Sequence, residues 1–332
     1  MVLSGSTQQE IAHAAAILRG GGLVAFPTET VYGLGVDAGN AHAVARIFAA
    51  KGRPVDHPVI VHLGAADELE RWALDVPPVA WRLAARFWPG PLTLILKRAP
   101  GVSDALTGGQ DTVGLRVPNH PVALALLQAF GGGLAAPSAN RFGRISPTLA
   151  AHVLAEFGDA VDCIIDGGPC AVGLESTILD LSGTRPRVLR PGAVTPDALA
   201  ETLGEPPTTR ATGGPRAPGR LASHYAPDTP LRLVAPAALE STIQSLTAAQ
   251  QSVAVLSLHP PATGGAQCHW MTMPTDASDY AQVLYARLRD LDSRGCRVIL
   301  VELPPVTMAW EAVHDRLLRA AGTGAAWQTV TP

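Results

Sequence analysis

Several polar side chains follow directly on a short apolar run near the start of the chain. The run covers residues 23–26 and stops at Pro27, because proline cannot donate a hydrogen bond to a sheet. The polar residues after it are Thr28, Glu29, Thr30 and Tyr32. Open α/β sheets bind ligands at the carboxyl ends of their strands, so the pattern predicts one wall of a binding cleft. A threonine-rich turn that closes a hairpin is the alternative.

Two cations lie two residues apart after the next expected helix. Lys51 continues the apolar stripe of that helix at its end, and Pro54 forces Arg53 out of helical geometry. An extended arginine beside a lysine can hold two sides of a phosphate or carboxylate, because arginine binds bidentately and lysine as a point charge. A lysine that reaches to solvent, or a basic surface turn, would give the same pattern.

Single arginines and hydroxyl groups recur at other strand ends. Gly114 and Arg116 share one strand face, which leaves room for a ligand or simply presents the arginine to solvent. Ser138 and Asn140 point the same way if extended, whereas a helix cap or an Asx-turn accounts for most such pairs. The remaining polar residues of this kind are Arg141, Arg144, Ser146, Glu175, Ser176, Thr177 and Arg190. Together they favour one cleft for a polyanion and a polar ligand, such as a nucleotide beside an amino acid.

The sequence contains no motif of covalent or metal catalysis. It has no nucleophile elbow, no H-E-x-x-H and no G-x-x-x-x-G-K-[ST]. The glycines 131–133 precede a strand rather than a helix, so we discount them as a phosphate cradle. The four cysteines have no metal-ligand spacing and are expected to be buried thiols, and we assign no metal ligands. The mechanism we favour is positioning and charge stabilisation without a covalent enzyme intermediate.

Composition limits the class of protein. The chain has 332 residues, 47% of them hydrophobic, and a formal charge of -3, which argues against a protein that coats nucleic acid or an anionic membrane. Residues 1–10 lack the features of a signal peptide, and no apolar run is long enough for a membrane helix. We therefore expect a cytoplasmic protein.

Strand and helix patterns alternate along the chain. A capping box at Thr7 and Glu10 predicts a first helix, glycines end it, and another helix is expected after Asn40. Further strand-like runs cover 59–63, 92–96, 113–117, 134–136, 163–165, 177–181 and 188–189, and helical patterns fall near 65–74, 78–87, 121–130, 147–157 and 196–203. This alternation predicts an α/β or mixed-sheet domain of about 200 residues.

A second domain follows a segment rich in proline, threonine and glycine. We predict a first domain over 1–204, a linker over 205–229 and a C-terminal domain over 230–332. The strands expected in the last domain are 231–234, 253–258 and 298–303, and the helices lie near 237–248, 277–293 and 309–320. The pattern indicates a small parallel sheet.

The order of the motifs resembles the Sua5/YrdC/YwlC family, the L-threonylcarbamoyladenylate synthases, over about residues 8–200. The matching motifs are Pro-Thr-Glu-Thr-Val-Tyr-Gly-Leu from Pro27, Lys-x-Arg-Pro from Lys51, Trp-Pro-Gly-Pro-Leu-Thr from Trp88, Gly-Leu-Arg-Val-Pro from Gly114, Pro-Ser-Ala-Asn from Pro137, Glu-Ser-Thr-Ile from Glu175 and Arg-Pro-Gly from Arg190. A later His-Tyr-Ala-Pro from His224 looks like the linker motif of the long, Sua5-type members. The resemblance implies a YrdC-like twisted mixed sheet flanked by helices, and a small Rossmann-like α/β domain at the C-terminus.

The resemblance also implies a reaction and its site. L-threonine, bicarbonate or CO2, and ATP would give L-threonylcarbamoyl-AMP and pyrophosphate, with Mg2+ accompanying ATP, and the product would pass to the tRNA threonylcarbamoyl-transferase machinery for t6A37 synthesis. By motif position the threonine contacts are Thr28, His62, Arg116, Ala136 and Ser176. The ATP contacts are Lys51, Arg53, Thr112, Ser138, Asn140, Ser146, Arg190 and Tyr225, with Lys51 and Arg53 also catalytic and Tyr225 on a lid.

Two departures from the family pattern and two rival functions remain. His57-Pro58-Val59 stands where members often read Asn-Pro-Leu, and the segment 217–222 lacks the lysine and tyrosine common before the linker motif. A double-stranded RNA or nucleotide-binding protein without synthase activity is one rival, and direct tRNA binding is expected to be weak at this net charge. The carbamoyl-phosphate-using hydrogenase maturation proteins are the other, but their acylphosphatase and zinc-finger parts are not visible in the sequence.

Overall fold

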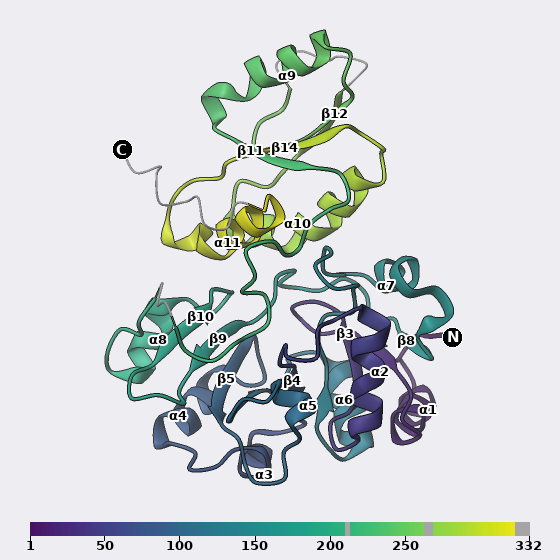
Figure 1. Cartoon of the computed structure of the whole chain (residues 1–332), viewed down its shortest axis with the longest axis vertical. Coiled ribbons are helices and arrows are strands. Elements are labelled where there is room, and N and C mark those ends of the chain that lie inside the picture. The colour runs from purple at the N-terminus through teal and green to yellow at the C-terminus, as the bar shows by residue number, and fades with distance from the viewer. Residues whose placement is uncertain (210–212, 262–267, 323–332) are drawn as a thin grey trace. The chain divides into compact units, whose positions relative to one another are not determined.

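The computed structural model describes residues 1–209, 213–261 and 268–322. The chain forms two compact units (Figure 1). The first consists of Met1–Phe142 and Ser146–Arg220, and the second of Gly143–Ile145 and the described residues from Leu221 onward. The predicted linker is thus divided between the units at Arg220. Residues 210–212 of that linker, and 262–267 and 323–332 of the predicted C-terminal domain, lie outside the described residues.

A mixed sheet forms the centre of the first unit. In the described residues it has ten strands in the order β1-β8-β2-β3-β7-β4-β6-β5-β9-β10. Their bounds are β1 Val2–Leu3, β2 Val24–Phe26, β3 Gly33–Asp37, β4 Ile60–His62, β5 Leu92–Lys97, β6 Thr112–Arg116, β7 Leu134–Ala135, β8 Cys163–Ile165, β9 Thr177–Asp180 and β10 Arg187–Arg190. Parallel and antiparallel pairs occur side by side, because β6 pairs in parallel with β4 and antiparallel with β5. The predicted mixed sheet flanked by helices is confirmed.

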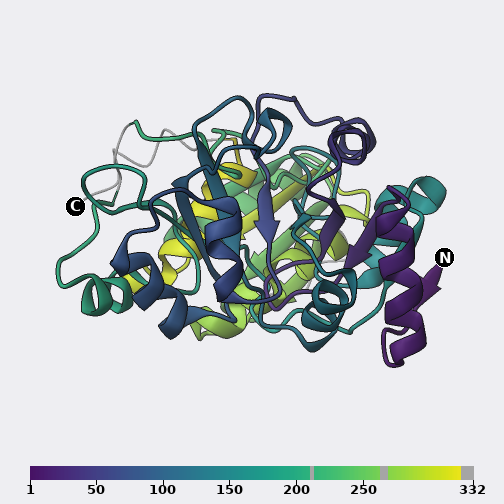
Figure 2. The ribbon, with the colours of Figure 1, turned by 90° about the horizontal axis from the view of Figure 1, so that it is seen from below.

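Helices cover this sheet and carry the caps that the sequence predicted. They are α1 Gln8–Arg19, α2 Ala41–Lys51, α3 Leu69–Trp72, α4 Pro78–Phe87, α5 Asp104–Thr107, α6 Pro121–Phe130, α7 Ala150–Phe157 and α8 Pro196–Leu203. The capping box of α1 is present, since Thr7 and Glu10 each bond to the other's backbone. Figure 2 shows α1 and α8 at opposite ends of the first unit, near the β1 and β10 edges of the sheet.

Strand β3 was not predicted from the sequence. Two of its five residues, Gly33 and Gly35, are glycines, which weaken a strand because they bring no side chain to pack. The structure gives the reason for Gly35: a Cβ atom there would lie 2.7 Å from the Phe26 ring. Close packing of the neighbouring strand therefore requires glycine at a position where strand propensity opposes it.

The second unit contains the predicted parallel sheet. Its described strands, β11 Leu231–Val234, β12 Val253–Ser257, β13 Cys268–Thr272 and β14 Val298–Glu302, pair in parallel in the order β11-β14-β12-β13. The helices are α9 Leu239–Ala248, α10 Ala277–Asp292 and α11 Glu311–Ala320. Strand β13 was missed, because it is a half-exposed edge strand without an apolar run. No described helix of either unit has the length and apolarity needed to cross a bilayer.

Candidate active site

The segment after β2 is a buried loop between antiparallel strands. Phe26 pairs with Gly33 across β2 and β3, so the hairpin alternative describes the backbone correctly. Residues 27–32 are nevertheless all buried, whereas connecting loops usually lie on the surface. The Thr28 hydroxyl donates to the carbonyl of Val31 at 2.6 Å and accepts from the backbone of Thr30. The single O–H donor of Thr28 is thus used inside a tight local turn.

The loop delivers a carboxylate to the predicted arginine. The Glu29 carboxylate lies 2.7 Å from Nη2 of Arg116, and the two side chains are 7% and 4% exposed. Nε of Arg116 donates to the carbonyl of Gly90 at 3.1 Å. The guanidinium is therefore held on two sides in a buried position, which excludes the solvent-facing alternative. A guanidinium fixed in this way is suited to bind a planar carboxylate.

His62 lies directly beside Arg116 in the sheet. The two residues are paired across β4 and β6, and the His62 ring makes an edge contact with Phe26. Burial, with a smaller contribution from the Arg116 charge, lowers the pKa of His62 to about 3. The imidazole is therefore neutral at physiological pH and adds no second charge beside the guanidinium.

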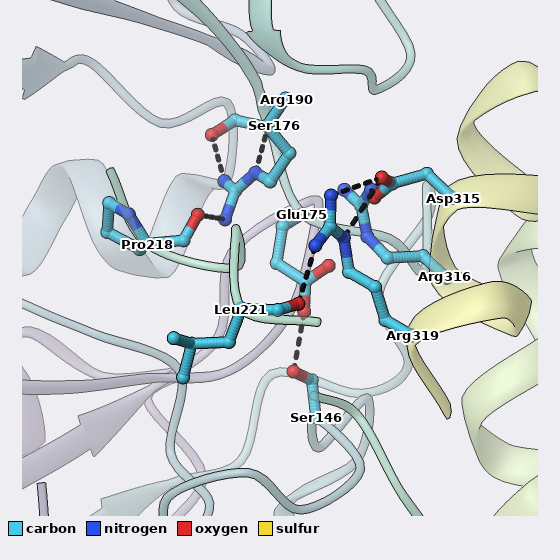
Figure 3. Close-up of polar contacts among 9 residues, drawn as sticks. All are labelled: Ser146, Glu175, Ser176, Arg190, Pro218, Leu221, Asp315, Arg316 and Arg319. Atoms are coloured by element: carbon cyan, nitrogen blue, oxygen red, sulfur yellow. Dashed lines mark hydrogen bonds and ion pairs between the residues drawn. The ribbon is translucent and has the colours of Figure 1, made fainter. Parts of the chain in front are cut away.

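Ser176 forms hydrogen bonds with a residue of β5 and with the arginine at the end of β10. Its hydroxyl lies 2.7 Å from that of Thr93, and its hydroxyl and carbonyl accept hydrogen bonds from Arg190 at 3.1 and 3.0 Å. The same guanidinium donates to the carbonyl of Pro218 at 3.2 Å, as Figure 3 shows. Arg190 therefore connects a predicted threonine contact to the part of the linker that belongs to the first unit.

Lys51 is buried at the end of α2 and is not directed to solvent. It is 2% exposed, and its ammonium donates to the carbonyls of Ser138 (2.6 Å) and Asn140. Its own carbonyl accepts from the backbone of Phe142 at 2.8 Å, so the loop after β7 wraps around this lysine. Burial and the charge of Arg53 lower the pKa of Lys51 well below its ordinary value. The negative charge of a bound anion would raise the pKa of Lys51 again and so oppose both effects.

Arg53 lies in the same neighbourhood as Lys51. Gly52 ends α2 with a φ of 62°, and Arg53 then leaves the helix. The Arg53 guanidinium donates to the carbonyl of Pro58 at 2.7 Å and lies 5.7 Å from the centroid of the Phe142 ring. The residue is 8% exposed, so the interpretation as a basic surface turn is wrong for both cations.

Other predicted ATP contacts lie on neighbouring segments of the first unit. The hydroxyl of Ser146 donates to the Glu175 carboxylate at 2.5 Å, as Figure 3 shows. Thr112 begins β6. Ala136, a predicted threonine contact, follows β7, and its N–H donates to the carbonyl of Ile60. Asn140 is buried, and its amide donates to the carbonyl of Arg141 at 2.7 Å.

Tyr225 belongs to the second unit. It is 1% exposed and packs against His224 and Tyr285, with the guanidinium of Arg316 5.3 Å from its ring centroid. Its φ of 61° is unusual for a bulky residue and strains the backbone.

Figure 3 also shows how an arginine of α11 holds the linker just before Tyr225. Arg319 donates to the carbonyl of Leu221 and to the Asp315 carboxylate.

Three side chains of this region gained a role only from the structure. Glu29 pairs with Arg116, Glu175 accepts from Ser146, and Thr93 contacts Ser176. Glu29 and Glu175 stand inside motifs that the sequence singled out, but their partners are 87 and 29 residues away in the chain (116 − 29 and 175 − 146). Thr93 ends the Trp-Pro-Gly-Pro-Leu-Thr motif, but the motif assigned it no role of its own, and its partner Ser176 is 83 residues away in the chain.

The described residues do not form a metal site of their own. No group of three or more His, Cys, Asp or Glu side chains among them could hold a metal ion.

Comparison with known proteins identifies the family. Residues 16–192 match the Sua5/YciO/YrdC family model, described as telomere recombination, and residues 194–322 match the model of the threonylcarbamoyl-AMP synthase C-terminal domain. The threonylcarbamoyl-AMP synthase of Pyrococcus abyssi is 40% identical over 93% of both chains. That of Bacillus subtilis is 39% identical over 94% of this chain and 93% of its own.

A solved structure agrees with this assignment. P. abyssi Sua5, crystallised with L-threonine, has a TM-score of 0.89 at 38% identity and covers 96% of both chains. Escherichia coli YciO, at 30% identity and a TM-score of 0.51, covers 58% of this chain and 94% of its own. The chain belongs to the Sua5/YrdC/YwlC family, and its curated relatives over the full length are threonylcarbamoyl-AMP synthases.

Proposed function

We propose that this enzyme makes L-threonylcarbamoyl-AMP and pyrophosphate from L-threonine, bicarbonate or CO2, and ATP. In this reaction the threonine amine adds to CO2 and loses a proton, which gives a carbamate. A carbamate oxygen then attacks the α-phosphate of ATP in line, and the bond to the β-phosphate breaks as pyrophosphate leaves. The protein must therefore bind an amino acid beside a triphosphate, orient both and stabilise negative charge.

The observation that carries the proposal is the burial of four cations in the first unit. Lys51, Arg53, Arg116 and Arg190 are each less than a tenth exposed. A buried charge is costly unless it is paired, and the first two have carbonyl groups among their partners. Such buried cations suit a site for anionic substrates, and the triphosphate of ATP and the carboxylate of threonine are both anionic.

The proposed binding residues form two groups, one for threonine and one for the phosphates of ATP. We assign the threonine carboxylate to Arg116, which Glu29 and the Gly90 carbonyl hold in place. Neutral His62 lies on the neighbouring strand β4, and Ser176, directly before β9, places its hydroxyl against Thr93 of the other neighbouring strand, β5. Both offer polar contacts without extra charge. Thr28 and the Ala136 backbone complete the proposed subsite. Because the Thr28 hydroxyl already donates to the Val31 carbonyl, we assign it to accept a hydrogen bond from threonine rather than to donate one.

We assign the phosphates to Lys51 and Arg53, and their charges to stabilisation of the transition state. The loop that carries Ser138 and Asn140 already surrounds the Lys51 ammonium, so a phosphate could replace those carbonyls. The remaining proposed ATP contacts are Thr112, Ser146, Arg190 and Tyr225. Tyr225 would act from a lid, a role that its strained backbone supports.

We propose that Mg2+ enters with ATP and is held by phosphate oxygens. When bound, it would neutralise phosphate charge during the transfer. The product would pass to the machinery that modifies tRNA, and the enzyme would act in the cytoplasm.

The test is pyrophosphate release by the full chain with ATP and bicarbonate. We expect release to require threonine and to be much weaker with serine or without an amino acid. Mass spectrometry should detect threonylcarbamoyl-AMP in the same reaction. If threonine does not stimulate release above serine, the synthase proposal fails, and salt-sensitive RNA binding in its place would favour the alternative.

A further inference from the structure

One arginine of the polar run after β7 has no role in the proposed synthase chemistry. Arg144 lies between Asn140 and Ser146, which are both proposed ATP contacts. Its segment, residues 143–145, belongs to the second unit, whereas the residues before and after it belong to the first. The loop that carries these ATP contacts therefore passes through the second unit and leaves it at Ser146. Whatever holds the three residues of the segment also restrains both ends of this loop.

The backbone of the segment pairs with the linker directly after Tyr225. Ala226 forms a parallel bridge with Arg144, and its N–H donates to the carbonyl of Gly143 at 2.9 Å. Tyr225, the proposed lid residue, immediately precedes Ala226 and has the strained φ of 61°. A strained backbone persists only where its surroundings fix it, and the bridge at Ala226 is one such restraint.

The side chain of Arg144 holds the same stretch of linker. Its two terminal nitrogens donate to the two carboxylate oxygens of Asp228, a bidentate geometry that arginine offers and lysine does not. The Asp292 carboxylate lies 3.7 Å from Nη2 of Arg144. It also accepts the backbone N–H groups of Asp228 at 3.0 Å and of Thr229 at 2.8 Å. One guanidinium and one carboxylate thus restrain the linker just after Tyr225.

Asp292 occupies a position that its own helix disfavours. It is the last residue of α10, where the partial negative charge of the helix C-terminus opposes a carboxylate. Its side chain is 13% exposed, so solvent screens this repulsion only weakly. The Arg144 guanidinium and the two linker N–H groups supply the compensating positive charge. The same helix also holds the far end of the segment, because Arg289 donates to the carbonyl of Ile145.

We propose that Arg144 is a positioning residue for ATP rather than a ligand of it. Its pair with Asp228 keeps the linker that carries Tyr225 beside the segment that leads into Ser146. Two groups of proposed ATP contacts are then restrained before the nucleotide binds, which lowers the entropy lost on binding. This inference rests on the proposed ATP contacts and adds to them a residue that acts through its partners.

The exposure of the pair limits the size of the effect. The Arg144 side chain is 31% exposed and that of Asp228 is 80% exposed, and exposed ion pairs contribute little. Arg144→Gln should therefore raise the KM for ATP about two- to fivefold, the upper range for such a pair. The KM for threonine should change less than about 1.5-fold, because the pair involves none of the proposed threonine contacts.

The first test measures hydrogen exchange of residues 226–229 in the full chain without ligand, by mass spectrometry and relative to the intrinsic rate of each sequence. Arg144→Gln should speed this exchange about two- to fivefold, because it weakens the contacts that protect these N–H groups. Asp228→Asn should act similarly, and the double variant should exchange no faster than either single variant, since both remove the same pair. The matched control is Arg294→Gln, which removes an exposed arginine 3.6 Å from Asp290 of α10 and should leave exchange and ATP binding unchanged.

The second test measures ATP binding in the same variants, by calorimetry without threonine and as the KM in pyrophosphate release. Weaker ATP binding in both single variants, with no further loss in the double variant, supports the positioning role. Unchanged exchange, faster exchange with unchanged ATP affinity, or equal losses for ATP and threonine would each overturn it. Calorimetry needs no turnover, so ATP binding without pyrophosphate release would refute the synthase proposal alone.

Discussion

Replacement of Arg116 by lysine tests the proposed threonine subsite most directly. Lysine keeps the positive charge next to Glu29, so the carboxylate is not left unpaired in a buried place. The change removes the planar fork and the hydrogen bond from Nε to the Gly90 carbonyl. What is lost is therefore the geometry that binds a carboxylate, while the local charge remains.

The structure sets the size of the expected effect. A hydrogen bond to a charged group is worth about 1.5–3 kcal/mol, so kcat/KM for threonine should fall about 10- to 150-fold. The KM for ATP should change less than about threefold, because the proposed phosphate contacts are on other segments. Pyrophosphate release measures both, with each substrate varied while the others are saturating.

The matched control is Arg46→Lys. Arg46 pairs with Asp162 at 3.1 Å, but these side chains are 40% and 42% exposed. A substitution at such a surface pair should alter stability by no more than about 0.5 kcal/mol and leave both kinetic constants unchanged. Thermal unfolding of both variants separates loss of fold from loss of binding. If a folded Arg116→Lys enzyme loses threonine and ATP equally, the assignment of Arg116 to the threonine carboxylate is refuted.

Two further predictions concern buried basic groups. Lys51→Met should reduce turnover at saturating substrates about 30- to 1,000-fold, because a desolvated phosphate contact is worth about 2–4 kcal/mol; turnover near that of the unaltered enzyme would contradict the proposed role. His62 has a pKa lowered to about 3 in the folded state, so the unfolded state binds more protons and stability falls as the pH drops below about 6.5. In urea titrations the advantage in unfolding free energy over His62→Gln should shrink by about 2 kcal/mol between pH 7 and pH 5, and a constant difference would show that His62 is not buried as a neutral ring.

The sequence was sufficient where the determinant is local. Thr7 and Glu10 form their capping box because both partners lie within one helical turn, and α4, α6 and α8 have the predicted bounds. The order of the motifs also identified the family. Each motif alone is a weak signal, but many motifs in the same order are unlikely to arise by chance. Gly33 and Gly35 misled the strand prediction, because the packing of Phe26 that requires a small residue at Gly35 comes from another strand.

Only the tertiary structure decided how the site residues are held. From the sequence, Lys51 and Arg116 could equally have faced solvent, and Glu29 had no role. The fold buries all three: the loop after β7 surrounds the Lys51 ammonium, and the loop after β2 places the Glu29 carboxylate beside the Arg116 guanidinium, although Glu29 and Arg116 are far apart in the chain. Desolvation and pairing depend on what surrounds a group in three dimensions, so side-chain pKa and orientation cannot be derived from residue type and spacing. Thus the sequence predicted which residues serve the site, and the fold determined their partners, burial and pKa shifts.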